Sequence, residues 1–437
     1  MARIARRCTP VVACALLACA AGPITAAQAA KHKAKSQTLV VCKHGCRYST
    51  IQQAVNHSGR KATIDVRPGK YVEGVFVKGH RHDGLHIIGI GKKPSAVVIE
   101  GRHAHGPEGA AQNGIEGDNV NNLDLENMKA EHFASNGFFI NGCKGYEMKD
   151  LIVGFNHSYG MYVFKCVGGR MTQSVGYGNG DSAFYVGGTP FQKHPIQTTL
   201  DHLRGYENVL GYSGTNSKYV VIRDSEFYNN GAGIVPNTLQ SEPWQPASSG
   251  LIEHNLVYWN NFDYYRPGSP VRTVSSGVGS KQANYPIGAG VMLFGTTDWT
   301  VKDNSIFGNF LWGAAAFSDP TNPTQKAVND GNRFIDNKMG GVFNDANGAD
   351  FYNDGSGRGT CFEGNSAGST FDHSNTEPDS QLYASCPNSF GTGTTAADSS
   401  QFGKLAAIVL SNPPTDQEKI WHVHAHPPRK GRTPFEG

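Results

Sequence analysis

Short apolar runs recur along the chain from about residue 137 to about residue 341, and most of them open on a glycine. Gly137 begins Gly-Phe-Phe-Ile-Asn, Gly160 begins Gly-Met-Tyr-Val-Phe 23 residues later, and Ser182 begins a third run after 22 more. The same spacing separates the openings of two further pairs of runs, Gly211 with Gly233 and Gly290 with Gly313. A period of short β runs between Gly and Asn corners predicts a solenoid, in which each turn of chain stacks on the one before.

A second, polar register follows the apolar one. The positions 13 and 14 residues after an opening glycine are repeatedly polar, and they include Asp150, Asp224, Ser225, Asp303 and Asn304. Polar side chains at the corners of stacked coils can satisfy backbone groups where the strands bend. We therefore expect side-chain ladders at these positions, with a structural role.

The apolar and polar registers together show which part of the chain follows the repeat. Residues 39–345 are predicted to form one all-β, single-stranded solenoid of parallel strands, and a short helix over 49–55 with a Ser or Thr cap is expected to close its open end. Two segments, 187–199 and 236–289, break the register. Loops that leave a rigid solenoid are where binding sites are commonly built.

Both ends of the chain lack the repeat. Residues 346–409 are rich in Gly, Ser, Asn and Pro and are predicted to be irregular, and the flanks 31–38 and 410–437 to be disordered.

Residues 1–30 have the features of a signal peptide: a basic head, a short apolar stretch and the cleavage sequence Ala27-Gln28-Ala29. The mature protein is then secreted and extracellular, and it begins just after residue 29. The alternative is lipid attachment at Cys19, which Leu17 disfavours at its place in the lipobox-like Leu16-Leu17-Ala18-Cys19. The apolar stretch is too short to span a membrane permanently, and we predict no transmembrane segment.

Six cysteines remain after cleavage, and an even number in an exported chain favours disulfides. Cys143 and Cys166 each lie six residues after the glycine that opens their coil, so stacking places them about 4.8 Å apart. Proximity in sequence pairs Cys42 with Cys46 and Cys361 with Cys386. A metal site is the alternative for Cys42 and Cys46, but no nearby Cys or His pair completes a zinc set.

Charge narrows the choice of partner. The formal net charge is +3, and the signal peptide accounts for three arginines and no acid, so the mature chain is close to neutral. A nucleic-acid-binding protein usually carries a strong basic excess, and we exclude that class. The expected oligomeric state is a monomer.

Several segments carry a resemblance to a known superfamily. Thr50-Ile-Gln-Gln-Ala-Val, Ile64-Asp-Val-Arg-Pro-Gly-Lys-Tyr-Val-Glu73, Ile87-Ile-Gly-Ile-Gly91 and Val98-Ile-Glu-Gly101 resemble the opening of right-handed parallel β-helix proteins of the pectate lyase-like superfamily. Asp181–Gly188, Asn208–Tyr212 and Gly233–Asn237 further resemble exported bacterial β-helix proteins of no established activity. The resemblance implies a right-handed parallel β-helix and is weak for function, because one fold carries many activities.

The catalytic motifs of the superfamily are missing. Of the pectin methylesterase segments only the structural Gly-Lys-Tyr-Val-Glu is matched, and the polygalacturonase, mannuronan epimerase and pectate lyase motifs are absent. No family's catalytic set can be transferred to this sequence.

Candidate chemistry lies between residues 181 and 224, where functional side chains gather. If the coils stack, Asp181 could lie near Glu207, and a glycosidase needs two carboxylates about 5–9 Å apart. A lyase or epimerase needs a cation or Ca²⁺ beside the uronate and a base to take a proton, roles open to His194 and Arg204. We predict no resident metal site and leave Ca²⁺ dependence open.

An aromatic column is the second candidate feature. Phe139, Tyr162 and Phe184 each lie two residues after the opening position of their coil, so they could face outward together and stack on sugar rings. The alternative, which we favour, is that the 236–289 loop covers the column. With Tyr185 and Asn237, the residues Tyr162 and Phe184 form the predicted substrate-binding set.

The sequence thus predicts an exported β-helix protein that acts on an extracellular polysaccharide as a uronate-type lyase, an epimerase or a hydrolase. The competing prediction is a non-catalytic protein that binds a glycan or the cell wall.

Overall fold

The computed structural model describes residues 37–106, 110–264, 271, 285–319, 322, 324, 326–340, 346–366 and 381–393. The predictions for the signal peptide, for Cys19 and for the 410–437 tail lie outside the described residues. No helix in the described part of the chain is long and apolar enough to cross a membrane.

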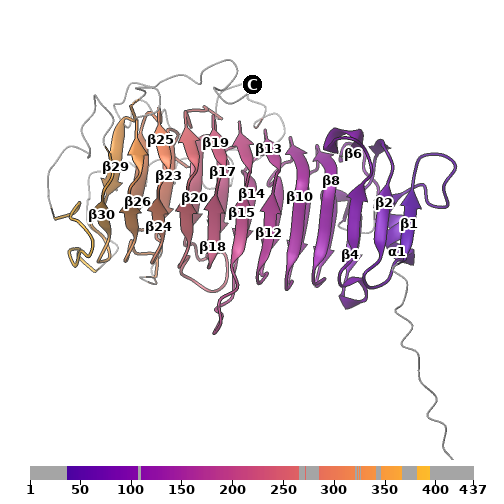
Figure 1. The fold of residues 1–437 in the computed structure, drawn as a ribbon, viewed down its shortest axis with the longest axis horizontal. Coiled ribbons are helices and arrows are strands. Elements are labelled where there is room, and N and C mark those ends of the chain that lie inside the picture. Colours follow the sequence, from indigo (N-terminus) through magenta and orange to yellow (C-terminus); the bar gives the residue numbers. More distant parts are fainter. Residues whose placement is uncertain are drawn as a thin grey trace, which may run out of the picture. The chain divides into compact units, whose positions relative to one another are not determined.

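The described chain is built from three parallel ladders of short strands (Figure 1). Ladder 1 comprises β1 (Thr38–Val41), β2 (Thr63–Val66), β5 (His86–Gly89), β8 (Leu123–Glu131), β10 (Tyr146–Gly154), β12 (Gly169–Thr172), β15 (Thr198–Asp201), β18 (Val220–Arg223), β21 (Leu251–Glu253), β24 (Thr300–Lys302), β27 (Arg333–Ile335) and β30 (Cys361–Glu363). The second halves of β8 and β10 continue into ladder 2.

Ladder 2 further comprises β3 (Gly69–Tyr71), β6 (Val97–Glu100), β13 (Val175–Tyr177), β16 (Arg204–Tyr206), β19 (Glu226–Tyr228), β22 (Leu256–Tyr258), β25 (Ser305–Phe307) and β28 (Lys338–Met339). Ladder 3 comprises β4 (Val75–Lys78), β7 (Ile115–Asp118), β9 (Phe138–Asn141), β11 (Met161–Phe164), β14 (Ser182–Gly187), β17 (Leu210–Thr215), β20 (Ala232–Asn237), β23 (Ala289–Phe294), β26 (Trp312–Phe317) and β29 (Ala349–Asn353). Three 3₁₀ turns, η1 (His80–His82), η2 (Pro94–Ala96) and η3 (Ala110–Gln112), lie in early corners.

From β4 onward each coil takes one strand from ladder 3, then one from ladder 1, then one from ladder 2. All pairings are parallel and join consecutive coils. This arrangement confirms the predicted fold class, a single-stranded parallel β-helix with a helical cap.

The capping helix is α1 (Ile51–His57), and its first turn is held by two side chains. Thr50 Oγ1 accepts a hydrogen bond from the Gln53 N–H at 3.2 Å, and the buried Glu73 carboxylate accepts from the Ile51 and Gln52 N–H groups at 2.9 and 3.0 Å. These bonds satisfy donors that the helix itself leaves free. The helix therefore begins where the Ser/Thr cap predicted it.

The coils extend beyond the expected limits. β29 and β30 continue ladders 3 and 1 past residue 345, because Ala349–Asn353 and Cys361–Glu363 still pair in register with the coil before. The segment 236–289 holds two excursions, 238–250 and 259–288, separated by the regular strands β21 and β22. The run of Pro and Ser obscured this intervening coil in the sequence.

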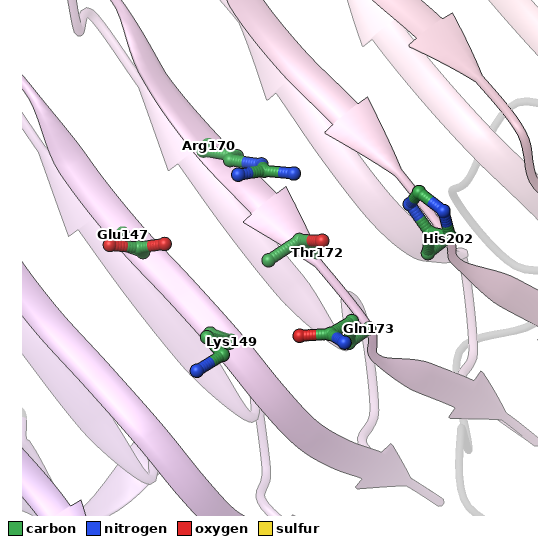
Figure 2. A pocket seen from close by; sticks show the side chains of 6 residues that line it. All are labelled: Glu147, Lys149, Arg170, Thr172, Gln173 and His202. Atoms are coloured by element: carbon green, nitrogen blue, oxygen red, sulfur yellow. The ribbon is translucent and has the colours of Figure 1, made fainter.

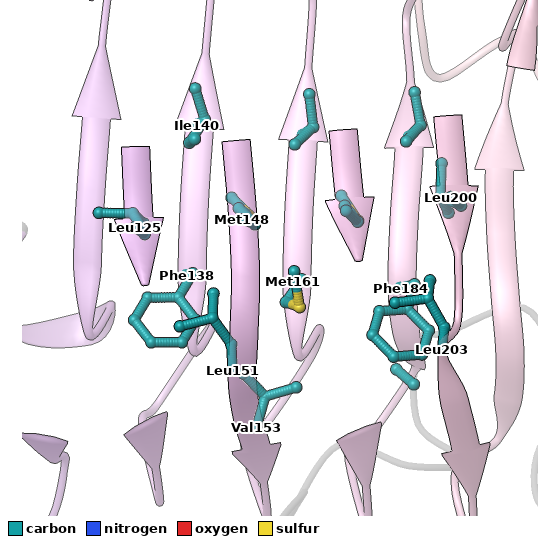
Figure 3. Packing of buried hydrophobic residues seen from close by; sticks show 14 of the residues in the cluster. Leu125, Phe138, Ile140, Met148, Leu151, Val153, Met161, Phe184, Leu200 and Leu203 are labelled. Carbon is teal, nitrogen blue, oxygen red and sulfur yellow. The ribbon is translucent and has the colours of Figure 1, made fainter. Parts of the chain in front are cut away.

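Apolar side chains from the three ladders fill the interior of the β-helix. Figure 3 shows Phe138, Met161 and Phe184 in one inward row of ladder 3, opposite Met148 and Leu200 of ladder 1. In the early coils the side chains that join this core alternate with outward ones along each straight stretch of strand, as the period of a strand dictates.

A column of asparagines closes the corner between ladders 2 and 3. In each case the backbone N–H and the side-chain NH₂ of one asparagine both donate to Oδ1 of the next, at distances from 2.9 to 3.2 Å. The members are Asn156, Asn179, Asn208, Asn230, Asn260, Asn309 and Asn347, and all are buried. The column satisfies backbone donors that the bend removes from the ladders.

A similar column lies between ladders 1 and 2. Ser225 N–H donates to Asn255, which donates to Asn304, which donates to Asn337. The ladder role predicted for Ser225 and Asn304 is confirmed. The same prediction was wrong for Asp150, Asp224 and Asp303, which take the left-handed turn one residue earlier, with φ of 51°, 48° and 53°, and point their carboxylates to solvent.

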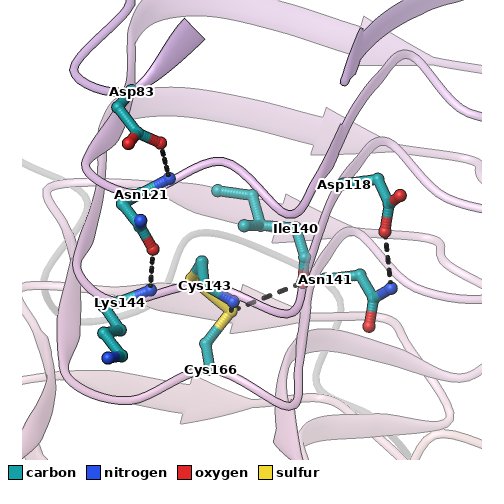
Figure 4. Close-up of a disulfide and its surroundings, with 8 residues drawn as sticks. All are labelled: Asp83, Asp118, Asn121, Ile140, Asn141, Cys143, Lys144 and Cys166. Atoms are coloured by element: carbon teal, nitrogen blue, oxygen red, sulfur yellow. Dashed lines mark hydrogen bonds between the residues drawn. A yellow bond between two sulfur atoms is a disulfide. The ribbon is translucent and has the colours of Figure 1, made fainter. Parts of the chain in front are cut away.

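Three disulfides are present, Cys42–Cys46, Cys143–Cys166 and Cys361–Cys386, in the pairing that the sequence predicted. Figure 4 shows Cys143 and Cys166 on consecutive coils, with the Asp118–Asn141 contact beside them. Their Cα atoms lie 4.5 Å apart, as expected for equivalent positions on stacked strands.

We expect Asn230→Ala to lower the free energy of unfolding by about 2–4 kcal/mol, because it removes four hydrogen bonds of the buried column and leaves the Asn208 N–H without its acceptor. Equilibrium denaturation measures the change. The matched control Asn56→Ala removes an exposed amide from α1 and should cost less than about 0.5 kcal/mol. Equal effects of the two substitutions would contradict a stabilising role of the asparagine column.

Candidate active site

The outer face of ladder 3 is where the described functional groups converge. On β4, β7, β9 and β11 buried residues alternate with half-buried or exposed ones, so two rows of side chains face outward. One row is Phe76, Glu116, Phe139 and Tyr162, and the other is Lys78, Asp118, Asn141 and Phe164. These rows lead directly to β14.

The predicted aromatic column exists, with one change of residue. Tyr162 pairs with Tyr185, while Phe184 pairs with Met161 and is fully buried in the core (Figure 3). The expectation that Phe184 faces outward was therefore wrong, and Tyr185 occupies the third outward position. The ladder aligns Met161 with Phe184, 23 residues apart, whereas the 22-residue spacing assigned to Ser182 shifted the register by one and exchanged the two faces.

Three tyrosines form a compact cluster around this column. The ring centroids of Tyr159, Tyr162 and Tyr185 lie 4.6 to 4.8 Å from one another, and Phe139 stacks on Tyr162 at 4.6 Å with 13° between the ring planes. Phe139, Tyr159 and Tyr162 keep part of their surface in solvent, whereas Tyr185 is buried. The cluster thus offers aromatic surface at its edge and closes around hydroxyl groups at its centre.

Two carboxyl groups lie within this cluster. Asp181, at the corner before β14, is close to the Tyr159 hydroxyl, and Glu242, from the 238–250 excursion, accepts a hydrogen bond from the Tyr185 hydroxyl. One oxygen of each, Asp181 Oδ1 and Glu242 Oε2, is buried with no hydrogen-bond partner in the described part of the chain. Neither carboxylate forms a salt bridge there.

The environment keeps both groups partly protonated near neutrality. Burial raises the pKa of Asp181 to about 7, against a smaller opposite effect of the Tyr159 hydroxyl. Burial also raises the pKa of Glu242 to about 7, and the charge of Asp181 contributes in the same direction. Two desolvated, mutually repelling carboxyl groups are a common arrangement for acid–base catalysis.

The backbone makes room for Glu242 over the sheet. A Cβ at Gly187 would lie 2.7 Å from Glu242 Oε2 and 2.6 Å from the Tyr185 hydroxyl, so only glycine leaves space for this pair. The 238–250 excursion thereby seats its acid directly on β14.

Lys218 binds the backbone of the 238–250 excursion. Its side chain is fully buried, and Nζ donates to the carbonyls of Trp244 and Pro246 and lies 4.5 Å from the Phe191 ring centre in the 188–197 excursion. Burial lowers the pKa of Lys218 to about 8. One ammonium group thus ties together the two excursions that flank the site.

The other residues predicted for catalysis lie elsewhere. Glu207 occupies an exposed left-handed corner after β16, with φ of 55°, and Arg204 is on ladder 2, with Nε 3.5 Å from Glu226. His194 is exposed in the 188–197 excursion. The charge that couples to Asp181 is Glu242 rather than Glu207, and no periodic signal marked it, because it lies in a segment without the repeat.

Asn237, predicted to bind substrate, ends β20 and is fully buried. Its Oδ1 accepts from Thr215 at 2.7 Å, and its Nδ2 lies 3.3 Å from Ser213 Oγ. The amide is used within the sheet.

Farther along ladder 3 the outer face is covered. Tyr264, Val271, Tyr285 and Ile287, from the 259–288 excursion, pack with outward residues of β20, β23, β26 and β29 in a second apolar cluster. The favoured expectation, that the 236–289 loop covers the column, is met only at Tyr185, which is buried and contacts Glu242 of that loop, whereas Phe139 and Tyr162 remain half-buried.

A separate pocket of about 340 Å³ lies on the outer face of ladder 1, and Figure 2 shows the six side chains that line it: Glu147, Lys149, Arg170, Thr172, Gln173 and His202. Its two cations are engaged, Arg170 with Asp201 at 2.7 Å and Lys149 with Glu126 at 3.0 Å. The pocket's charges thus serve an ion-pair network between coils.

Glu100, Glu131 and His132 are the one described group with ligand atoms close enough for a metal ion. Lys70 lies 2.6 Å from Glu100, and Lys129 lies 2.6 Å from Glu131. These ammonium groups already neutralise the carboxylates, so the donor set does not fit a cation such as Ca²⁺.

No family model matches the chain, and no curated protein matches it significantly. Among solved structures it is similar to the A-module of a mannuronan C-5 epimerase of Azotobacter vinelandii, with 14% identity over 75% of this chain and 94% of that one and a TM-score of 0.47. A rhamnogalacturonan lyase gives 11% identity over 79% and 86% and a TM-score of 0.49, and a pectate lyase 13% over 89% and 90% and 0.41. These are similarities of fold.

The raised pKa values predict a pH dependence of stability. Because Asp181 and Glu242 hold protons in the folded state up to about pH 7 but lose them near pH 4 when unfolded, their contribution to stability falls as the pH rises from about 4 to 7. Glu242→Gln should remove its share, up to about 3 kcal/mol, and flatten the curve of unfolding free energy against pH. An unchanged curve in this variant would contradict the desolvation of Glu242.

Proposed function

We propose that this protein is a secreted glycoside hydrolase that acts on an extracellular polysaccharide, with Asp181 and Glu242 as its two catalytic carboxyl groups. The observation that carries the proposal is the pair itself: two coupled carboxyl groups with pKa values of about 7, beside half-exposed aromatic rings on one face of the β-helix.

The two carboxyl groups of the pair can take the two roles that hydrolysis requires, a general acid and a general base or nucleophile. Repulsion favours the state in which one group is protonated and the other is ionised, and the two titrate as a unit. The protonated group gives its proton to the glycosidic oxygen as the bond to the anomeric carbon breaks. The ionised group assists water, or attacks the anomeric carbon itself, and water restores the starting state.

Hydrolysis suits these residues better than β-elimination or epimerisation. Those reactions need a base for the C5 proton and a cation beside the uronate carboxylate. Burial raises the pKa of Tyr159, Tyr162 and Tyr185, which makes their phenolates poor candidates for the base. Arg204 lies on ladder 2, beside Glu226 of the same ladder, and not on ladder 3 with the carboxyl pair.

A purely binding role would leave the carboxyl pair without a purpose. Burying an acid with an unpartnered oxygen costs stability, and the Phe139–Tyr162 stack alone provides a surface for sugar rings. Buried acids that lower stability in this way occur mostly at functional sites.

Export is part of the proposal. The three disulfides suit an oxidising compartment, and the basic, apolar and Ala-x-Ala segments of residues 1–30 suit a cleaved signal peptide.

The test is a screen of the mature protein on neutral, amino-sugar and acidic polysaccharides, following reducing ends and 235 nm absorbance with and without Ca²⁺. We expect new reducing ends without a rise at 235 nm. Asp181→Asn and Glu242→Gln should each lower the rate at least 100-fold with unchanged circular dichroism, whereas Glu147→Gln, a carboxylate on the outer face of ladder 1, should leave it unchanged.

A rise at 235 nm would replace the hydrolase by a lyase. Loss of activity in Glu207→Gln but not in Glu242→Gln would move the site to the pair that the sequence predicted. Binding to a glycan with no product at all would favour the non-catalytic glycan-binding protein.

A further inference from the structure

The outward rows of ladder 3 that lead to the carboxyl pair carry more acids than bases. A binding site for a uronate polymer needs the opposite balance. Around this face, from β4 to the pair, the acids are Glu116, Asp118, Asp181 and Glu242, and the bases at the surface are Lys78 and Lys165. A further base, Lys218, is buried and donates to the carbonyls of Trp244 and Pro246. Four carboxyl groups thus face two ammonium groups, and no arginine occupies an outward position on β4, β7, β9, β11 or β14.

The acids sit where a bound chain would pass. Glu116 lies between Phe76 and Phe139 in one row, and Asn113 Nδ2 donates to its Oε2 at 2.8 Å. Asp118 lies in the adjacent row and accepts from Asn141 Nδ2 at 2.9 Å (Figure 4). These hydrogen bonds hold both carboxylates on the sheet without neutralising them.

The cations are placed to pack on rings. Lys78 Nζ lies 5.8 Å from the Phe76 ring centre, and Lys165 Nζ lies 4.8 Å from that of Phe164. Neither is the bidentate guanidinium that recognises carboxylates best. A uronate on this face would bring like charges together and leave its own carboxylate poorly paired.

The aromatic residues supply the complementary attraction. Phe139 and Tyr162 stack in register on neighbouring strands and keep exposed edges, and Phe76 lies two strands away in the same row. Consecutive strands are about 4.8 Å apart, a spacing comparable to one pyranose repeat. Rings in such a row offer apolar surface to the C–H faces of successive sugars.

We propose that the substrate of this site is a polysaccharide without carboxylates, made of neutral or amino sugars, which lies along the outward rows of β4 to β11 and reaches Asp181 and Glu242 at β14. The inference rests on the proposed hydrolase function and names its substrate class. Carboxylate groups on Glu116 and Asp118 accept hydrogen bonds from sugar hydroxyls or ammonium groups and repel uronates.

The experiment measures binding by calorimetry to the mature protein carrying Glu242→Gln. The probes are hexasaccharides of β-1,4-glucose, N-acetylglucosamine, glucosamine, galacturonate and mannuronate, at low and at high salt. At least one carboxylate-free hexamer should bind at least tenfold more tightly than either uronate. A preference for the glucosamine hexamer that weakens with salt would identify an amino-sugar substrate, and one for a neutral hexamer that salt leaves unchanged a neutral substrate.

Two variants test whether the outward rows of β4 to β11 set the preference for carboxylate-free hexamers. Phe139→Ala should weaken binding of the preferred hexamer about tenfold, while the matched control Tyr177→Ala, a half-buried ring on ladder 2, should leave it unchanged. The double variant Glu116→Gln with Asp118→Asn should raise the affinity for the uronate hexamers.

Uronate binding equal to or tighter than that of every carboxylate-free hexamer, or absence of binding to all of the latter, overturns the inference. The two proposals fail separately. Hydrolysis of polygalacturonate would keep the hydrolase and overturn the substrate class, whereas tight binding of a neutral or amino-sugar hexamer that the unsubstituted protein never cleaves would do the reverse.

Discussion

The structure depends on how each coil satisfies its backbone where the chain turns. Strand pairing serves the straight segments, but at the corner between ladders 2 and 3 the bend interrupts it. There, one buried asparagine per coil both donates to and accepts from its neighbours, from Asn156 to Asn347. Because every amide is used twice or more, the column fixes the height of each coil as well as its direction.

The two carboxyl groups that we propose for catalysis lie outside this regular interior, where the repeat is relaxed. Asp181 belongs to the corner before β14, and Glu242 comes from an excursion that the periodic pattern does not constrain. Gly187 leaves the space over the sheet that Glu242 occupies, and Lys218 donates a hydrogen bond to the backbone of the excursion. The rigid strands thus provide position, and a corner and an excursion provide the two carboxyl groups that we propose for catalysis.

The same division explains what the sequence could reveal. The 22–23-residue period sufficed for the fold, and stacking of equivalent positions sufficed for Cys143–Cys166. The column of rings was found, but assigning Ser182 rather than Ala183 to the opening position put Phe184 outside in place of Tyr185. Asp181 could be singled out as an acid at a coil edge, whereas Glu242 could not, since its contact with Tyr185 spans 57 residues and depends on how a Pro-rich excursion folds back.

The asparagine column also bears on how such a protein can change over evolutionary time. Each member between the two ends of the column accepts from the asparagine of one neighbouring coil and donates to that of the other, so a duplicated coil that carries its own asparagine would find matching partners on both sides. The molecule can therefore gain or lose whole turns by duplication or deletion of a gene segment of one period. Under the proposed function, the number of sugars accommodated along ladder 3 would change with it, while Asp181 and Glu242 beside β14 stay as they are.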